Sequence, residues 1–169
     1  MRSSRVRVAG PSAISVALVL ASGLVACNGP ALDLAKQLTV EDVSTGWFDA
    51  GLVNGQNKLV PTLSFRLKNT SDQTLRTLQV NVLFFRVSED NEWGSGFKTV
   101  VGSAGLAPGA TSEPQTVASQ LGYTGSEPRQ QMLQNPQFVD TKARLFAKYG
   151  SQQWTRIGEY PVTRRLITP

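Results

Sequence analysis

Residues 78–85 read Leu-Gln-Val-Asn-Val-Leu-Phe-Phe, the clearest strand signal in this chain of 169 residues. Apolar Leu78, Val80 and Val82 alternate with polar residues, which is the period of a strand with one buried face. From Val82 onward both faces are apolar, as is typical of a strand in the centre of a sheet. The segment therefore predicts a central β-strand.

A second alternating segment, Leu63-Ser-Phe-Arg-Leu, lies shortly before it. Residues 69–73 between the two segments read Asn-Thr-Ser-Asp-Gln. Short polar side chains of this kind stabilise turns. We therefore predict that the two segments pair as a hairpin.

Extended runs separated by Gly, Pro and Asn recur along the chain, whereas the 3.6-residue period of helices is sparse. We predict strands at about 39–44, 46–53, 59–68, 77–87, 96–102, 116–121, 139–149 and 152–163, with a helical turn at 31–37. Seven or eight short strands separated by turn signals are typical of an antiparallel β-sandwich. The expected fold is all-β, with one sandwich domain over residues 39–169.

The last hairpin is expected to turn at Gly150-Ser151. Pairing outward from that turn sets Tyr149 opposite Gln152, Ala147 opposite Trp154, and Lys142 opposite Glu159. In this register Trp154 lies on the core face, together with Val139, Ala143 and Leu145.

Residues 120–140 are the least strand-like part of the domain. Ser126 is a good N-cap residue, Pro128 suits a first turn, and Asn135-Pro136 ends the segment, so a short helix is predicted at Glu127–Gln134.

This insertion has two interpretations, which can coexist. In one, the helix closes an open end of the sandwich and Met132, Leu133 and Phe138 enter the core. In the other, the segment is a partner surface, because aromatic, Arg and Met residues are enriched at interfaces. That candidate surface consists of Tyr123, Arg129, Met132 and Phe138, with Tyr123 and Arg129 facing outward.

Trp47 and Trp93 lie near predicted strand ends or loops. They are either core residues or a platform on which a ligand or glycan could stack.

Catalytic signals are few. The sequence has no His, which excludes imidazole bases and His-ligated metal sites, and it has a single Cys. The densest acidic group, Glu89-Asp90-Asn91-Glu92, lacks the spacing of a Ca²⁺ loop and is read as a solvated loop. We therefore expect that the protein is not an enzyme and that it holds no metal and no cofactor. A hydrolase that uses carboxylates is the remaining catalytic alternative.

The first 26 residues combine Arg2, Arg5 and Arg7 with an apolar run over 13–26. This pattern is typical of a secretory signal peptide, because a spanning helix needs about 20 apolar residues. The run ends in Leu24-Val25-Ala26-Cys27, which resembles the lipobox of bacterial lipoproteins. That resemblance implies cleavage before Cys27 and its lipidation, with a short tether at 27–38.

The resemblance also implies a location. Asn28 follows the lipidated Cys, which in Gram-negative cells implies the outer membrane, facing the periplasm. In a Gram-positive cell the same residues imply the outer face of the plasma membrane. Without the three leader arginines, 14 basic residues remain against 12 acidic ones, which is too weak a charge to predict a nucleic-acid partner.

Three segments together resemble the FxLYD-type modules of exported bacterial proteins: 63–72, 78–82 and Leu106-Ala-Pro-Gly109. The resemblance covers about residues 59–117, although Phe85-Arg86 stands where the family has Tyr-Asp. It implies an immunoglobulin-like sandwich and a binding role, with no shared chemistry.

We therefore expect a membrane-anchored envelope lipoprotein that acts as a non-catalytic binding or assembly module. Its expected partners are the membrane, through the lipid on Cys27, and an envelope protein. The alternative is a binder of small ligands or glycans that uses Trp47 and Trp93.

Overall fold

The computed structural model describes residues 32–167. The signal peptide, the lipobox with Cys27, and Asn28 lie outside the described residues. The described part begins just before α1 (Leu34–Gln37), where the sequence predicts a helical turn.

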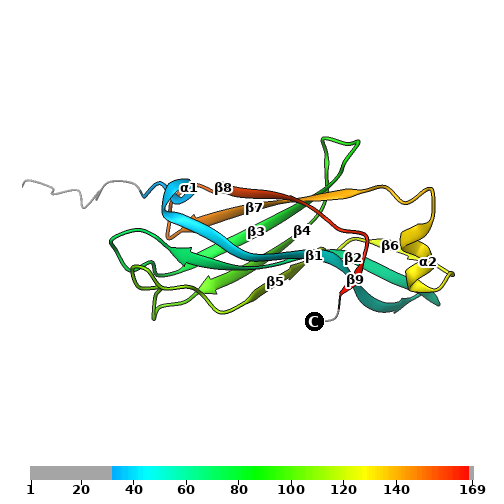
Figure 1. Ribbon diagram of the computed structural model, residues 1–169, viewed down its shortest axis with the longest axis horizontal. Helices are drawn as coiled ribbons and strands as arrows, with labels where there is room; N and C mark the ends of the chain where they lie inside the picture. Colours follow the sequence, from blue (N-terminus) through cyan, green and yellow to red (C-terminus); the bar gives the residue numbers. More distant parts are fainter. Residues whose placement is uncertain (1–31, 168–169) are drawn as a thin grey trace, which may run out of the picture. The chain divides into compact units, whose positions relative to one another are not determined.

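Two sheets make up the described domain (Figure 1). One has the order β5-β2-β1-β9, with β6 beside β2, and the other has the order β4-β3-β7-β8. Neighbouring strands are antiparallel except for β1 and β9, which are parallel. The strands are β1 (Leu38–Val53), β2 (Gln56–Asn69), β3 (Leu78–Arg86), β4 (Glu92–Val101), β5 (Gln115–Ala118), β6 (Tyr123–Gly125), β7 (Thr141–Tyr149), β8 (Thr155–Pro161) and β9 (Leu166–Ile167).

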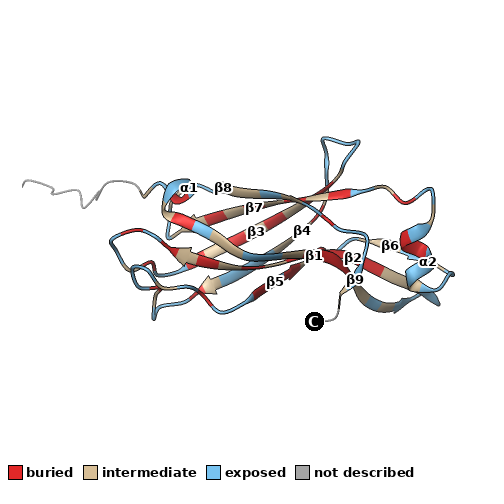
Figure 2. Ribbon diagram, in the orientation of Figure 1, coloured by how far each residue is buried: buried red, intermediate tan, exposed pale blue. Residues whose placement is uncertain are grey.

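The predicted fold class is confirmed: the chain is an all-β, immunoglobulin-like sandwich. Strands β1, β2 and β5 correspond to A, B and E of that fold, and β3, β7 and β8 to C, F and G. The alternating apolar residues of β2 and β3 point into the core between the sheets, as the buried bands in Figure 2 show. Those residues are Leu63, Phe65, Leu67, Val80, Val82 and Phe84.

The prediction that β2 and β3 form a hairpin is wrong. Strand β2 pairs with β1, β5 and β6, whereas β3 pairs with β4 and β7. The connection at 70–77 crosses between sheets, and it is fixed midway where buried Leu75 bridges to Leu106. Alternation indicates one buried face in either arrangement, so it could not distinguish pairing within a sheet from facing across the core.

Strand β1 is one strand of 16 residues where the sequence predicted two. Its register against β2 shifts between Glu41 and Ser44, where Asp42 takes a positive φ of 52°. The predicted break, between 44 and 46, lies just after this irregularity, where β1 pairs with β2 without interruption. The sequence did not predict β6 and β9, which have three and two residues and are too short for a periodic signal.

The hairpin of β7 and β8 forms, and its turn is as expected, because the Gln152 amide donates to the Tyr149 carbonyl at 3.0 Å. The register beyond the turn is wrong. Ala147 lies opposite Thr155 and not Trp154, and Glu159 lies opposite Arg144. A slip of one residue moves side chains to the other face. Trp154 is accordingly at the surface, with 39% of its area exposed.

The insertion contains α2 (Arg129–Gln134), which begins two residues later than predicted. Pro128 occupies the N-cap position, and no side chain caps the helix, so the assignment of Ser126 as the cap is wrong. Met132, Leu133 and Phe138 are all buried. The interpretation of the insertion as a core plug is therefore confirmed.

Candidate functional site

Four aromatic side chains form a cluster at the α2 end of the sandwich. Trp47 of β1 lies at its centre, with ring centroids 4.7 Å from Phe138, 5.6 Å from Tyr123 and 6.2 Å from Trp93. Phe138 meets Trp47 edge-on, and aromatic pairs in such geometries add stability beyond the area they bury. We call these four residues the aromatic cluster.

The Tyr123 hydroxyl ties the cluster to the segment before β7. It accepts a hydrogen bond from the Val139 amide and donates one to the Val139 carbonyl, both at 3.2 Å. Tyr123 therefore faces inward, contrary to the expectation that it faces solvent.

Two arginines cover the cluster. The Arg86 guanidinium lies 4.9 Å from the Trp93 ring and pairs with Glu89 at 3.1 Å. Arg164 lies 5.1 Å from the Phe138 ring, pairs with Asp140 at 2.6 Å and donates to the Phe138 carbonyl. The hydrogen bond to Glu89 raises the pKa of Arg86, and the hydrogen bond to Asp140 raises that of Arg164.

The ligand-stacking candidates do not form an exposed platform. Trp47 is fully buried, which confirms its interpretation as a core residue. Trp93 is half-buried beneath Arg86 and Tyr123.

The partner-surface candidates are also largely enclosed. Met132 and Phe138 are buried, and Tyr123 belongs to the aromatic cluster. Arg129 forms an ion pair with Asp49 of β1 at 2.5 Å, and this contact lowers the pKa of Asp49. The four residues lie close together, but they hold the insertion to the sandwich and do not form a free surface.

A pocket of about 330 Å³ opens beside the aromatic cluster. Its only carboxylate is that of Glu127, so the pocket brings no pair of carboxylates together for acid–base chemistry. Across residues 32–167 no three acidic side chains gather as a metal site would require. The pocket is lined by Tyr123, Thr124, Gly125, Glu127, Met132, Asn135, Gln137 and Phe138.

The outer face of the β4-β3-β7-β8 sheet carries an exposed aromatic pair that sequence reasoning missed. Phe97 of β4 is 59% exposed, and its ring lies 6.2 Å from that of Trp154 at an interplanar angle of 82°. Lys148 of β7 approaches the Trp154 ring, with its amine 5.8 Å from the centroid. Only the correct register of the β7–β8 hairpin could have predicted this pair.

The same outer face is basic. Glu159 is shared by three cations: Arg144 at 2.7 Å, Arg156 at 3.7 Å and Lys142 at 3.9 Å. The hydrogen bond from Arg144 is the main reason that the pKa of Glu159 is lowered. We call Phe97, Trp154, Lys142, Arg144, Lys148, Arg156 and Glu159 the basic–aromatic face.

A second exposed apolar feature is the tip of the β1–β2 hairpin. Leu52 is 68% exposed and Val53 is 39% exposed, next to a tight turn in which Asn54 and Gly55 both have positive φ. An Asn-Gly pair is itself a strong hairpin signal, which could have revealed this turn from the sequence. The tip is held against the insertion, because the Asn57 amide donates to the Glu127 carbonyl at 2.9 Å.

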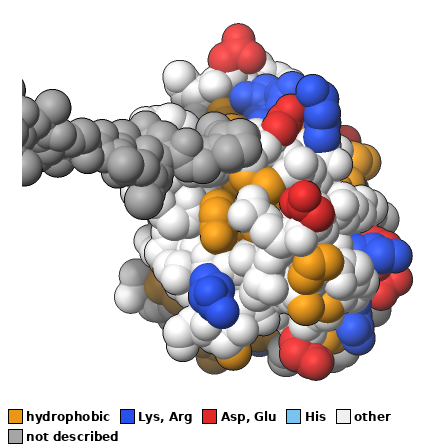
Figure 3. Space-filling model, turned by 90° about the vertical axis from the view of Figure 1, so that its left-hand side faces the viewer, with side chains coloured by type: hydrophobic (Ala, Val, Ile, Leu, Met, Phe, Trp, Pro, Cys, Tyr) orange, Lys and Arg blue, Asp and Glu red, His pale blue; other side chains and the backbone are white. Residues whose placement is uncertain are grey.

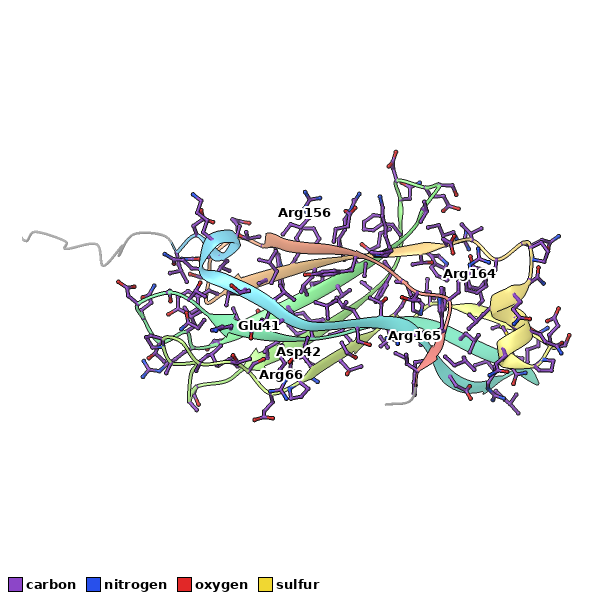
Figure 4. The ribbon with its side chains drawn as sticks, in the orientation of Figure 1. Glu41, Asp42, Arg66, Arg156, Arg164 and Arg165 are labelled. Atoms are coloured by element: carbon purple, nitrogen blue, oxygen red, sulfur yellow. The ribbon has the colours of Figure 1, made fainter. Side chains whose placement is uncertain are left out.

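Charged side chains near the C-terminal end have structural roles. Arg165 donates to the Thr45 carbonyl at 2.9 Å and to the Ser44 hydroxyl at 2.7 Å, next to the β1–β9 pair (Figure 4).

Neither helix in the described part of the chain is long and apolar enough to cross a membrane.

No family model matches this chain, and no curated protein matches it. Similar solved structures include the Northeast Structural Genomics Consortium target SoR45, with 14% identity and a TM-score of 0.43 over 76% of this chain and 88% of that chain. Another is target BeR40 from Bordetella pertussis, provisionally assigned as the ApaA protein, with 18% identity and a TM-score of 0.42 over 75% of this chain and 93% of that one. Both TM-scores are low, so these similarities carry no argument about function.

Proposed function

We propose that this protein is an exported envelope lipoprotein, anchored through Cys27, whose sandwich is a non-catalytic binding module for an envelope protein. The resemblance of Leu24–Cys27 to a lipobox supports the anchor. The resemblance of residues 59–117 to FxLYD-type modules supports a binding role. With Asn28 after the Cys, the anchor would lie in the outer membrane of a Gram-negative cell, or in the outer leaflet of a Gram-positive plasma membrane.

The observation that carries the binding role is the apolar hairpin tip. The β1–β2 hairpin tip, with the exposed Leu52 and Val53, lies at the α2 end, whereas the described chain begins at the α1 end (Figure 1). The ion pair of Asp49 with Arg129 links the base of the tip to α2. Leu52 and Val53 are consecutive strand residues, so they face opposite sides of the tip, and each side presents one exposed apolar side chain to a partner.

The partner surface can be tested by crosslinking in intact cells. Wild type should give one dominant crosslinked partner, and the L52S/V53S variant should lose it. V43S is the matched control, because Val43 is as exposed as Val53 but lies at the β1 bulge, and it should keep the partner. A partner retained by L52S/V53S would contradict the assignment of the tip.

The anchor has its own test. In a C27S variant the domain should fractionate as a soluble, folded protein, because the acyl chains provide the membrane affinity. Full membrane retention of C27S would contradict the proposed lipidation.

The pocket beside the aromatic cluster favours a second candidate function, the binding of a small ligand or glycan. Its volume of about 330 Å³ lies at the lower end of the range for ligand sites. A ligand bound there should raise the melting temperature of the wild type. A T124W variant, which places a large side chain in the lining, should lose that rise while melting near the wild-type temperature without ligand.

A further inference from the structure

We propose that the basic–aromatic face lies flat on an anionic phospholipid surface, with Trp154 and Phe97 at the interface and the cations on the headgroups. The proposal rests on the lipid anchor of the proposed function. It adds an orientation: the β4-β3-β7-β8 sheet faces the membrane and the β5-β2-β1-β9 sheet faces away.

The short length of chain between Cys27 and the described domain is the first argument. The described chain begins at Leu32, five residues after Cys27, a span of at most about 18 Å. Helix α1 follows at once and contacts β7 and β8. The β7–β8 turn, with Trp154 and Lys148 beside it, therefore lies at the tethered end of the domain (Figure 1).

Charge is the second argument. Arg144, Arg156 and Lys142 share the one carboxylate of Glu159, and Lys148 has no ion pair among residues 32–167. The face therefore has an excess of positive charge, which attracts anionic headgroups. In the view of the α1 end, a group of basic side chains lies near the top of the molecule, next to acidic ones (Figure 3). Arg156 itself points away from the sandwich (Figure 4).

The aromatic pair is the third argument. Trp is enriched at membrane interfaces, where its ring is half in the apolar region and its N–H can reach water. Trp154 and Phe97 meet at 82°, so their rings form a ridge and not the flat platform on which a sugar ring would stack. A ridge of two rings surrounded by cations fits a fluid headgroup layer better than a sugar.

Lipid is favoured over a protein at this face because the anchor holds the face close to the bilayer. Stable membrane attachment commonly combines an acyl chain with a basic patch. Here the acyl chain on Cys27 and the basic–aromatic face are joined by a short tether and would bind the same membrane.

The test uses the lipidated full-length protein in phosphatidylcholine vesicles made with or without phosphatidylglycerol. Brominated phospholipids report contact by quenching tryptophan emission. The emission of Trp154 is the difference between the wild type and W154F. We expect at least about twofold quenching of this component in vesicles with phosphatidylglycerol, little in pure phosphatidylcholine, and recovery in about 0.5 M NaCl.

Charge variants sharpen the test. K148Q/R156Q should lose most of the Trp154 quenching. The matched control R66Q/K68Q removes the same charge from β2, in the other sheet, and its Trp154 emission should be quenched as in the wild type.

The outcomes separate this proposal from the function on which it rests. If the protein floats with the vesicles but Trp154 is not quenched, the orientation is wrong and the anchor stands. If the protein does not float, both the anchor and the orientation fail. A photocrosslinker at position 97 that joins a protein in cells, and not lipid, would make the face a protein interface and overturn the proposal.

Discussion

At the scale of single residues, Trp47 and Trp154 have opposite surroundings. Trp47 is enclosed by the aromatic cluster and has no exposed area, whereas Trp154 lies on the outer face against Phe97. The sequence predicted burial for Trp154 because the strands were paired residue by residue outward from a turn at Gly150-Ser151. In the structure Ala147 lies opposite Thr155, one residue later than predicted, and this shift places the Trp154 side chain on the outer face of the sheet.

The two tryptophans should therefore respond differently to truncation. Trp47→Ala should lower the free energy of unfolding by about 3–5 kcal/mol, because it empties the centre of the cluster. Trp154→Ala should cost less, about 1–2 kcal/mol, because its ring is partly exposed and loses only the contacts with Phe97 and Lys148. Urea unfolding at pH 7 measures both values. A cost of several kcal/mol for Trp154→Ala would contradict the register of β7 and β8.

The candidate site residues could be predicted in part. Met132 and Phe138 are apolar in a segment between strands, so their burial was one of the two expected interpretations. The inward orientation of Tyr123 depends on a hydrogen bond to Val139, and sequence gives no signal for a contact of that kind. Trp154 was placed wrongly because the period of a strand is two residues, and one slip reverses every face.

At the scale of elements, the connection from β2 to β3 is built around one buried amide. Asn69 donates to the Gln73 carbonyl at 2.8 Å and to the Leu106 carbonyl at 2.9 Å, and its oxygen accepts from the amide and hydroxyl of Ser71. The polar residues that suggested a hairpin turn instead hold a crossover between the sheets.

Replacing Asn69 by Ala should destabilise the fold by about 1–3 kcal/mol, because buried partners lose their hydrogen bonds. The neighbouring Thr70 is exposed, and Thr70→Ala should have little effect. Thermal or urea unfolding compares the two. Equal effects would show that the amide network does not hold the crossover.

The close approach of β4 and β5 gives a second prediction at this scale. An added Cβ on Gly96 would lie 2.5 Å from the Ala118 carbonyl oxygen and 2.6 Å from Val117. Gly96→Ala should therefore cost about 1–3 kcal/mol through strain. Gly102 has open space around it, so Gly102→Ala is the matched control and should be neutral or slightly stabilising. If both variants unfold at the wild-type denaturant midpoint, the sheets are not packed this closely.

At the scale of the whole molecule, the free energy of unfolding should fall in acid and should hardly change with pH around neutrality. The folded-state pKa values of Asp49, next to Arg129, and Glu159, next to Arg144, lie below their ordinary values. A lowered pKa gives stability that is present above the unfolded pKa and is lost as pH falls through the folded pKa. The sequence has no His, whose titration would fall between about pH 5 and 8.

The denaturant midpoint should therefore be level from about pH 8 to 5 and should fall below about pH 4. D49N and E159Q should each have a lower midpoint at neutral pH and a weaker dependence on acid. A midpoint that changes steeply between pH 6 and 7 would contradict this assignment.

The sequence predicted the class of fold better than its connections or its surfaces. Short alternating runs with turns between them are typical of a β-sandwich whichever strands pair, so the fold class could be predicted from composition and period. The pairing of β2 with β5 and β6, and the contact of Arg129 with Asp49, bring together residues at least 50 positions apart. Periodicity is local and contains no information about such contacts.

Strand β1 has a geometric consequence for the proposed anchor. It runs from the α1 end to the Leu52–Val53 tip over 16 residues, a length of at most about 50 Å. With Cys27 in the bilayer and the basic–aromatic face against it, this strand would lie roughly in the membrane plane. Rotation about the lipid would then carry the tip around a circle of radius about 50–70 Å. Partners embedded in the same membrane would be met by two-dimensional search within that circle.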